Sequence, residues 1–244
     1  MSGLILALQF FTRLPVHSNV DFSEKNLRTA FFFLPLIGFL FGGSIVLILY
    51  AYHEPALTAL LAVLAYVLLG GSLHLDGLSD CADGLAANAE KKKTLAIMSD
   101  PHTGTFGVIA IVLDLLVRFV MYQFLSGMPL FLLLSPVFAR VFVLYAIQYG
   151  KPAKQSGLGF LFFTSISKRC FPVYFLLSVS GIALLCFFKR ISLPFLALPV
   201  INLIVVITIV QYAKKKLGGT TGDVNGAIVE VLDLLNLLLC YFLW

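Results

Sequence analysis

The strongest constraint on this fold is a set of apolar runs about twenty residues long. Seven such runs occur, at about 30–52, 55–75, 105–126, 129–149, 171–188, 192–213 and 224–244. A helix needs ~20 apolar residues to cross a bilayer. Only 12% of the residues are charged, against roughly 25% in soluble proteins. We therefore expect an all-α fold: a polytopic integral membrane helical bundle with about seven transmembrane helices, forming a single domain over residues 1–244.

The chain begins with the apolar stretch MSGLILALQFFTRLPVH, residues 1–17. It lacks the basic start and the A-x-A site of a cleaved signal peptide. A short helix at the membrane interface is the better interpretation.

The distribution of Lys and Arg predicts the orientation. With the N-terminus inside, only Lys189 and Arg190 lie outside, and Arg118 and Arg140 lie within spans. The remaining 13 of the 17 basic residues fall in cytoplasmic segments: Arg13, Lys25, Arg28, Lys91, Lys92, Lys93, Lys151, Lys154, Lys168, Arg169, Lys214, Lys215 and Lys216. Basic residues gather on the cytoplasmic side of membrane proteins. These cytoplasmic Lys and Arg residues account for the net charge of +5, so the charge does not indicate a nucleic-acid partner.

Three acids are concentrated in HLDGLSDCADGL, residues 74–85. Asp76, Asp80 and Asp83 are spaced i, i+4, i+7, which places them on one helical face. Their charges repel one another near the low-dielectric membrane edge, and no Lys or Arg is interleaved. We predict that they hold Mg²⁺ or Mn²⁺, hard cations that prefer oxygen ligands. The alternative is a solvated helix end. His74 is a candidate for substrate binding rather than for the metal.

Two glycine-rich segments on the same side are candidate phosphate-binding sites. SDPHTGTFG, residues 99–107, leads into a span, and a turn of this kind can offer backbone N–H groups to a phosphate or simply cap a helix. KKKLGGTTGDVNGA, residues 214–227, repeats the pattern, with a basic anchor and a loop as the plain alternative. The candidate substrate-binding residues in these segments are Asp100, His102, Gly104, Thr105, Lys216, Gly219, Thr221 and Gly222. Asp223 is a catalytic candidate.

Several charges fall within the apolar runs, where they are costly and suggest either function or a structural ion pair. Asp114 and Arg118 are spaced i, i+4 and can pair with each other. Arg140 has no local partner. Glu230 and Asp233 lie in the last span, where they can lean toward the cytoplasmic cavity or pair with Arg140.

Acids for a divalent metal, glycine turns and basic residues on one membrane face suit a phosphorylated substrate. The blocks that carry these residues also resemble those of a known family. RLPV (13–16), FFFLPLIG (31–38), HLDGLSDCADGL, IMSDPHTGTFG (97–107) and LGGTTGDVNGA (217–227) follow one another as in the cobalamin synthase family, the adenosylcobinamide-GDP ribazoletransferases.

The resemblance implies a multi-pass, Mg²⁺-dependent enzyme of the bacterial cytoplasmic (inner) membrane, with its active site facing the cytoplasm. It would join adenosylcobinamide-GDP to α-ribazole or α-ribazole 5′-phosphate, releasing GMP, in the last stage of nucleotide-loop assembly. Asp76, Asp80 and Asp83 would hold Mg²⁺ on the pyrophosphate. Asp223, or an acid of the cluster such as Asp80, would orient or deprotonate the attacking hydroxyl. The resemblance is compatible with a homo-oligomer and with contacts to other nucleotide-loop assembly enzymes.

The sequence departs from the family pattern at three places. DPH (100–102) stands where DSR is common, His17 follows RLPV, and the loop at 155–159 lacks acids. These changes affect the expected contacts to phosphate rather than the reaction.

Two other functions fit part of the pattern. A CDP-alcohol-type phosphotransferase making a lipid would carry a longer acidic motif, and Ala86 and Ala87 stand where an Ala-Arg pair is expected. A transporter with an acidic cytoplasmic mouth would place its polar groups near the midplane. The acids here gather at the cytoplasmic edge instead.

Overall fold

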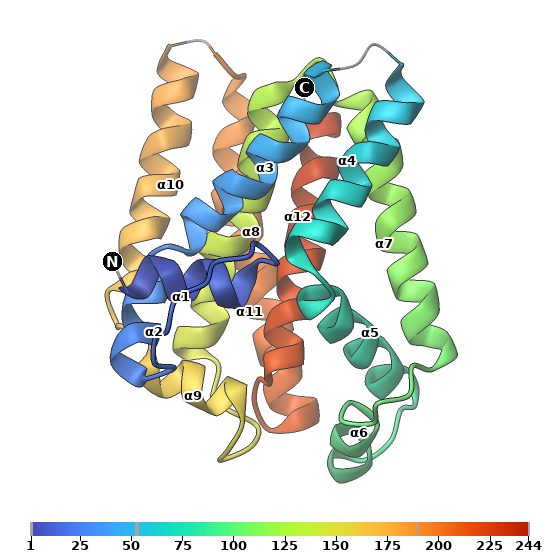
Figure 1. The fold of residues 1–244 in the computed structure, drawn as a ribbon, viewed down its shortest axis with the longest axis vertical. Helices are drawn as coiled ribbons and strands as arrows, with labels where there is room; N and C mark the ends of the chain where they lie inside the picture. Colours follow the sequence, from blue (N-terminus) through green and yellow to red (C-terminus); the bar gives the residue numbers. More distant parts are fainter. Residues whose placement is uncertain (1, 52–53, 189, 244) are drawn as a thin grey trace.

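The computed structural model describes residues 2–51, 54–188 and 190–243, and the regular elements in those ranges are helices (Figure 1). In chain order they are α1 (Ser2–Phe11), α2 (Glu24–Phe31), α3 (Leu34–Ala51), α4 (Pro55–Gly70), α5 (Leu73–Ala86), α6 (Lys91–Ile97), α7 (Thr105–Phe124), α8 (Pro129–Tyr149), α9 (Leu158–Ser165), α10 (Cys170–Phe187), the 3₁₀ helix η1 (Leu193–Ala197), α11 (Leu198–Leu217) and α12 (Gly222–Leu243).

Six of these segments are long and apolar enough to cross a membrane: α3, α7, α8, α10, η1 with α11, and α12. The pair α4 and α5 passes the same test jointly but is bent by 91°. Counting the bent pair as one crossing gives seven. The all-α, multi-pass architecture expected from the apolar runs is confirmed.

The second predicted span, 55–75, is wrong as a single helix. Gly71 has a φ of +62°, a left-handed conformation that glycine adopts without steric penalty. The helix therefore ends at Gly70, although the apolar run continues through it. A new helix, α5, starts at Leu73 in a different direction and carries the acids of the 74–85 motif, which do lie on one helix as predicted.

The other boundaries agree to within a few residues, and α8 matches its predicted range. The short N-terminal helix is confirmed as α1. Helix α11 extends beyond the predicted end at 213 and includes three lysines in its last turn, where cations interact favourably with the helix dipole. Helices α2 and α9 were not predicted, because each spans only eight residues.

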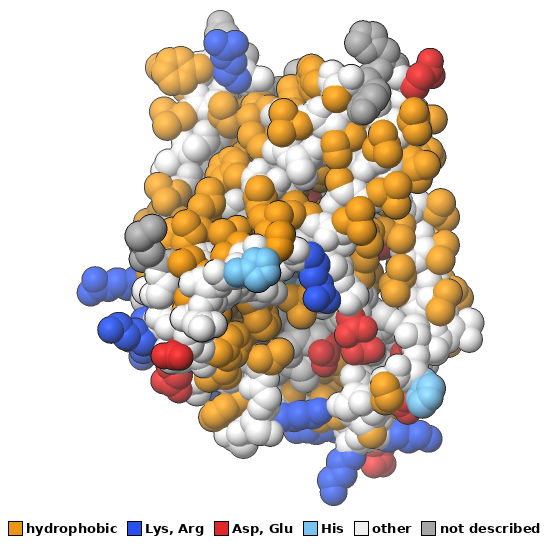
Figure 2. All heavy atoms as spheres, viewed as in Figure 1, with side chains coloured by type: hydrophobic (Ala, Val, Ile, Leu, Met, Phe, Trp, Pro, Cys, Tyr) orange, Lys and Arg blue, Asp and Glu red, His pale blue; other side chains and the backbone are white. Residues whose placement is uncertain are grey.

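The two ends of the bundle differ in charge. In Figure 1 helices α3, α7, α10 and α12 run upward and α8 and α11 run downward, so that α11 ends and α12 begins at the lower end. In Figure 2 hydrophobic side chains cover the upper part, and most Lys, Arg, Asp and Glu side chains lie at the lower end. The connection that holds Arg190 lies at the opposite end, and Lys189 lies outside the described residues.

Helix α8 is the centre of the bundle and packs against α3, α10, α11 and α12. Most of α8 is buried by these neighbours, whereas α7 and α10 leave much of their apolar surface exposed. Helix α12 packs between α8, α5 and α7. Its first turn therefore meets the acidic face of α5 at the charged end of the molecule.

Candidate active site

The site is built where α5 crosses the start of α12. Gly77 on α5 lies directly against the backbone of Asp223, and a side chain there would have no room. This close approach brings Asp76 and Asp80, on either side of Gly77 along α5, to the N-terminal turn of α12. Two acidic motifs almost 150 residues apart thus form one site.

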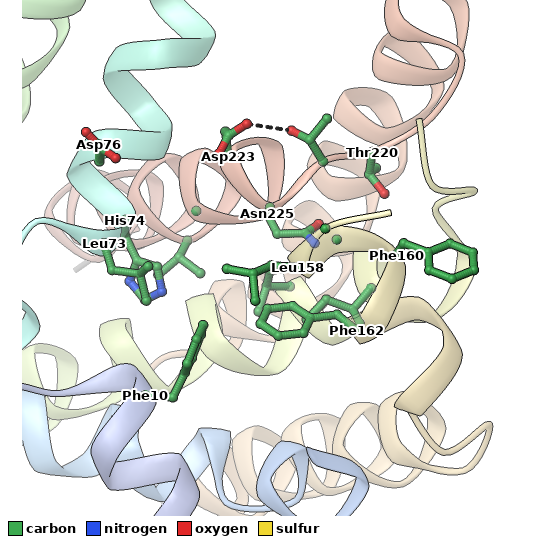
Figure 3. Close-up of a pocket in the computed structure, with 18 of the residues that line it drawn as sticks. Phe10, Leu73, His74, Asp76, Leu158, Phe160, Phe162, Thr220, Asp223 and Asn225 are labelled. Atoms are coloured by element: carbon green, nitrogen blue, oxygen red, sulfur yellow. Dashed lines mark hydrogen bonds between the residues drawn. The ribbon is translucent and has the colours of Figure 1, made fainter. Parts of the chain in front are cut away.

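Thr221 fixes the start of α12. Its hydroxyl accepts the backbone N–H of Val224 at 3.2 Å and donates to Asp223 Oδ2 at 3.1 Å (Figure 3). A threonine in this position caps the helix, and an acid in the first turn is favoured by the helix dipole. Asp223 is therefore held in place with its other carboxylate oxygen left for a ligand.

The acids of this site repel one another. The charges of Asp76, Asp223 and Asp83 all act on the carboxylate of Asp80. Within the described ranges none of these four forms an ion pair with Lys or Arg. The positive charge of Lys154, from the loop after α8, acts on Asp223.

Asp83 accepts two hydrogen bonds that its i, i+7 spacing from Asp76 did not predict. Its Oδ2 accepts the backbone N–H of Gly104 at 2.7 Å, and its Oδ1 accepts that of Gly107 at 2.9 Å. Asp83 therefore caps α7 from a neighbouring helix. These N–H groups, which were expected to face a phosphate, are bound to protein in this structure. Thr105, the first residue of α7, is exposed.

The residues fit a divalent metal only with help from the substrate. No group of three or more His, Cys, Asp or Glu side chains in the described part of the chain is gathered into a metal site. However, Mg²⁺ is usually held by one or two carboxylates together with substrate phosphates. Asp76, Asp80 and Asp223 supply the oxygen donors and unbalanced negative charge that such an ion requires.

Asp100 and His102 pair with each other at the surface. Asp100 Oδ1 accepts the backbone N–H of His102 at 2.9 Å and lies 2.7 Å from His102 Nδ1. The backbone N–H and the ring of His102 together lower the pKa of Asp100. The two side chains remain 54% and 90% exposed, respectively. Neither lines the cavity that contains Asp76 and Asp223, described below.

The loop after α8 is tied to both glycine-rich segments. Thr220 donates its N–H to the Lys151 carbonyl at 2.7 Å, and Ala153 donates to the Thr220 carbonyl at 2.9 Å. Gly219 permits this pairing, because a Cβ there would overlap the Lys151 carbonyl. Lys154 in turn donates to Ser99 Oγ at 2.9 Å. This places Lys154 beside Asp223.

Lys216 lies elsewhere. Its ammonium group donates to Asn88 Oδ1 at 3.2 Å, in the turn after α5. It does not line the cavity described next. Its predicted role in substrate binding stays a prediction.

A cavity of about 340 Å³ opens at this site (Figure 3). Its polar wall includes His74, Asp76 and Asp223, together with Thr221 and Gly222. The opposite wall is apolar and comes from α1 and α9. Sequence reasoning did not identify several residues that line it: Phe10, Phe11, Lys154, Leu158, Phe162 and Asn225. Lys154 had been noted only as a cytoplasmic cation.

A second, more open cavity of about 530 Å³ shares Asp76 with the first. Arg13, Ser72 and Thr103 also line it. Arg13 belongs to the RLPV block and forms no ion pair in the parts of the chain described. Asp76 therefore stands between two cavities, each with one basic side chain.

A buried ionic network lies deeper in the bundle. The Arg118 guanidinium donates to Asp114 at 2.8 Å, to Asp233 at 2.8 Å and to Glu230 at 2.5 Å. The predicted Asp114–Arg118 pair is confirmed. Glu230 and Asp233 also pair with Arg118 and not with Arg140. Both carboxylates lie on the side of α12 that faces α7, the helix that carries Arg118. Glu230 additionally accepts the Tyr66 hydroxyl at 2.7 Å.

Arg140 is bound differently. It donates to the Pro136 carbonyl at 3.1 Å, and its guanidinium lies 4.0 Å from the centre of the Phe41 ring. Its Nε and Nη2 atoms have no hydrogen-bond partner in the described structure. The Phe41 ring is thus a main electrostatic partner of this buried charge.

These features define a class: a multi-pass helical membrane protein with an acidic, metal-compatible site at one end of the bundle. The chain belongs to the Cobalamin-5-phosphate synthase family, whose model matches residues 3–241.

Curated relatives support the same assignment. An adenosylcobinamide-GDP ribazoletransferase of Treponema denticola is 39% identical, covering 100% of this chain and 98% of its own. Proteins of the same name from Clostridium novyi and Clostridium botulinum (strain Okra / Type B1) are 32% and 31% identical. Each alignment covers 98% of this chain, and 96% and 97% of theirs, respectively. No solved structure matches the chain.

Proposed function

We propose that this protein transfers the adenosylcobinamide phosphate of adenosylcobinamide-GDP to α-ribazole or α-ribazole 5′-phosphate, in the last stage of cobalamin nucleotide-loop assembly. The observation that carries this proposal is the convergence of separate family segments on one cavity. Asp76 of the 74–85 motif and the start of α12 both line it, and Lys154 joins them. The family match spans all of these segments. The family match does not favour the two alternatives, a lipid-synthesising phosphotransferase and a transporter.

The reaction is a displacement at phosphorus. The oxygen of a ribazole hydroxyl forms a bond to the phosphorus attached to cobinamide. The bond from that phosphorus to the bridging oxygen of the pyrophosphate breaks, and its electron pair leaves with GMP. The hydroxyl proton passes to a carboxylate, for which Asp223 is the first candidate and Asp80 the second. Both need only reach the hydroxyl within about 3 Å or through one water.

Charge neutralisation supports this chemistry. Asp76 and Asp80, with Asp223 alongside, would hold Mg²⁺, and Mg²⁺ bound there would neutralise the charge that develops on the pyrophosphate oxygens. Asp83 fixes α7 against this site. Lys154 in one cavity and Arg13 in the other supply positive charge on either side of Asp76. This arrangement suits two substrates that approach Asp76 from different directions.

The site is proposed to face the cytoplasm of a bacterial cell, with the chain in the inner membrane. The end of the bundle that holds the acids also holds most of the Lys and Arg residues, as expected for a cytoplasmic face. Phosphorylated nucleosides and GDP derivatives are cytoplasmic metabolites in general, and a site at this edge is open to them.

The decisive experiment is an assay of the full chain purified in detergent or nanodiscs. Adenosylcobinamide-GDP and α-ribazole should together yield GMP and adenosylcobalamin in equal amounts, only when Mg²⁺ is present. α-Ribazole 5′-phosphate should be assayed in parallel. GMP formed without an acceptor, or none with either acceptor, would refute the proposal. A CDP-alcohol with a lipid acceptor serves as the control substrate pair.

A further inference from the structure

The cavity of about 340 Å³ has an aromatic wall that the reaction chemistry does not use. Phe10 and Phe11 come from α1, and Phe162 comes from α9. The Phe10 and Phe162 rings meet edge to face, with centroids 5.5 Å apart. Figure 3 shows Phe10, Leu158 and Phe162 turning toward one space beneath the polar wall. Phe10 is only half-buried, so part of its ring remains available to a ligand.

The same space contains a side-chain amide, Asn225, whose oxygen has no partner among the described residues. Asn225 is 6% exposed, and its Oδ1 atom has no hydrogen-bond partner in the described structure. The side chain lines the cavity and points into it from α12, two residues after Asp223 (Figure 3). An unpaired buried carbonyl oxygen is destabilising. A hydroxyl or N–H donor on a bound ligand would satisfy it.

The geometry points to this cavity as the binding site of the acceptor nucleoside, with its aromatic base against Phe10 and Phe162 and its ribose at Asn225. The inference rests on the proposed function, which supplies α-ribazole as the acceptor. Its base is a dimethylated benzimidazole: flat, bicyclic, and apolar along the edge that carries the methyl groups. Aromatic side chains are the natural partners of such a base, since stacking or edge contacts need no hydrogen bonds.

The volume of the cavity suits the acceptor and is too small for the donor. Ligand cavities usually measure roughly 300–1,000 Å³, and this one, at about 340 Å³, is near the lower limit. A nucleoside with a bicyclic base fits such a volume. A corrin ring with its amide side chains does not, and must lie outside. The donor then reaches Asp76 from the second, more open cavity, on the side of Arg13.

The position also suits the chemistry. Asp223 and Asp76 line the same cavity as the aromatic wall. A base held against that wall, with its ribose at Asn225, directs a ribose hydroxyl toward Asp223. The acceptor is thereby oriented before the donor phosphorus meets it, which is the main contribution a protein can make to a displacement at phosphorus.

The test compares cavity variants with matched controls in the full chain in nanodiscs. Phe10→Ala, Phe10→Leu and Asn225→Ala should each raise the KM for α-ribazole by roughly 10-fold, the size expected for one lost contact to a base or ribose. The KM for adenosylcobinamide-GDP should change less than about two-fold. Phe119→Ala removes a half-buried aromatic ring outside the cavity. Asn202→Ala removes a buried amide whose Oδ1 also has no hydrogen-bond partner among the described residues. Both controls should leave both KM values unchanged.

A second acceptor makes the test specific for the aromatic wall. The α-riboside of unmethylated benzimidazole lacks two methyl groups, and an apolar pocket discriminates roughly 10-fold or more per group of this size. The wild-type protein should show that preference for α-ribazole, and Phe10→Ala should reduce it toward equality. Equilibrium dialysis of α-ribazole without donor should show the same loss of affinity, independent of turnover.

The outcomes separate this inference from the proposed function. No GMP from the wild-type protein with either acceptor refutes the proposed function itself. An active wild-type protein whose cavity variants keep the acceptor KM and acceptor binding overturns only the inference. Variants that raise the donor KM instead assign the cavity to adenosylcobinamide-GDP, which overturns it as well.

Discussion

Gly77 on α5 packs so closely on Asp223 that a Cβ at Gly77 would lie 2.6 Å from the Asp223 carbonyl oxygen. This contact sets the distance between the acids of α5 and the start of α12. We predict that Gly77→Ala forces the two helices apart and lowers turnover by roughly 100-fold, the usual cost of a misplacement of about 1 Å in a catalytic site. The assay is GMP release under saturating substrates.

The matched control is Gly43→Ala on α3. A Cβ there meets nothing within 4 Å. Alanine is the better helix former, so this variant should keep full activity and equal or slightly higher stability. If Gly77→Ala turns over as fast as Gly43→Ala, the two helices are not held in place by this contact.

We expect the carboxylates of α5 to have two different roles. Asp76→Asn and Asp80→Asn should each abolish turnover and shift the Mg²⁺ midpoint upward, since each removes a negative charge from the expected metal site. Membrane insertion should be unaffected, which a fluorescent fusion and gel filtration will test. Near-normal rates for both variants at low Mg²⁺ would contradict a shared metal.

Asp83 should behave differently, because both of its oxygens hold the start of α7. Asp83→Ala should lower the stability of the protein by about 0.5–2 kcal/mol, the usual value of a lost helix cap. Thermal unfolding in detergent measures this. Lost turnover and a raised Mg²⁺ midpoint, with unfolding unchanged, would instead identify Asp83 as a metal ligand, as the sequence predicted.

Asp223 offers the clearest distinction between a base and a metal ligand. Asp223→Asn keeps the size of the side chain but cannot take a proton, so turnover should fall by roughly 10²–10⁴. Binding of adenosylcobinamide-GDP to this variant should show the same Mg²⁺ midpoint as the wild-type protein. A midpoint moved to much higher Mg²⁺ would make Asp223 part of the metal site and would leave Asp80 as the candidate base.

The sequence predicts the spans well where local chemistry marks their ends. Pro129 starts α8 and Gly150 follows its last residue, and the predicted range agrees with the structure. The break at Gly71 was not predictable from hydropathy, because apolar residues continue on both sides of it. The ion pair of Asp114 and Arg118 was predictable, because both residues lie on one helix at i, i+4 spacing.

The site is only partly predictable, because most of it depends on contacts between distant segments. Asp76 and Asp223 stand out as acids in an apolar chain, and both line the cavity. The partners of Asp83 are 21 and 24 residues away, beyond any local rule. Asn225 and Phe10 carry no distinctive spacing, and only the packing of α1, α9 and α12 around one cavity identifies them.

The buried arginines provide a paired prediction about stability. Arg118 binds three carboxylates, whereas Arg140 donates one hydrogen bond and contacts a ring. Arg118→Met should therefore destabilise the protein by about 3–5 kcal/mol, because it leaves three buried acids without their cation. Arg140→Met should cost much less, since it removes unpaired N–H groups together with the charge. Unfolding in detergent compares the two, and equal losses would show that the carboxylates do not depend on Arg118.

The orientation of the bundle in the membrane determines which compartment the site faces. Helix α12 begins beside the acids and runs to the opposite end of the molecule, where the C-terminus is marked in Figure 1. If the basic, acid-bearing end faces the cytoplasm, a reporter fused to the C-terminus should lie outside it. An alkaline-phosphatase fusion there should be active, as should one placed after Gly127, in the turn between α7 and α8. Fusions after Gly157 or Gly219, at the acid-bearing end, should be inactive. The reverse pattern would place the site outside the cytoplasm and exclude cytoplasmic nucleotides as its direct substrates.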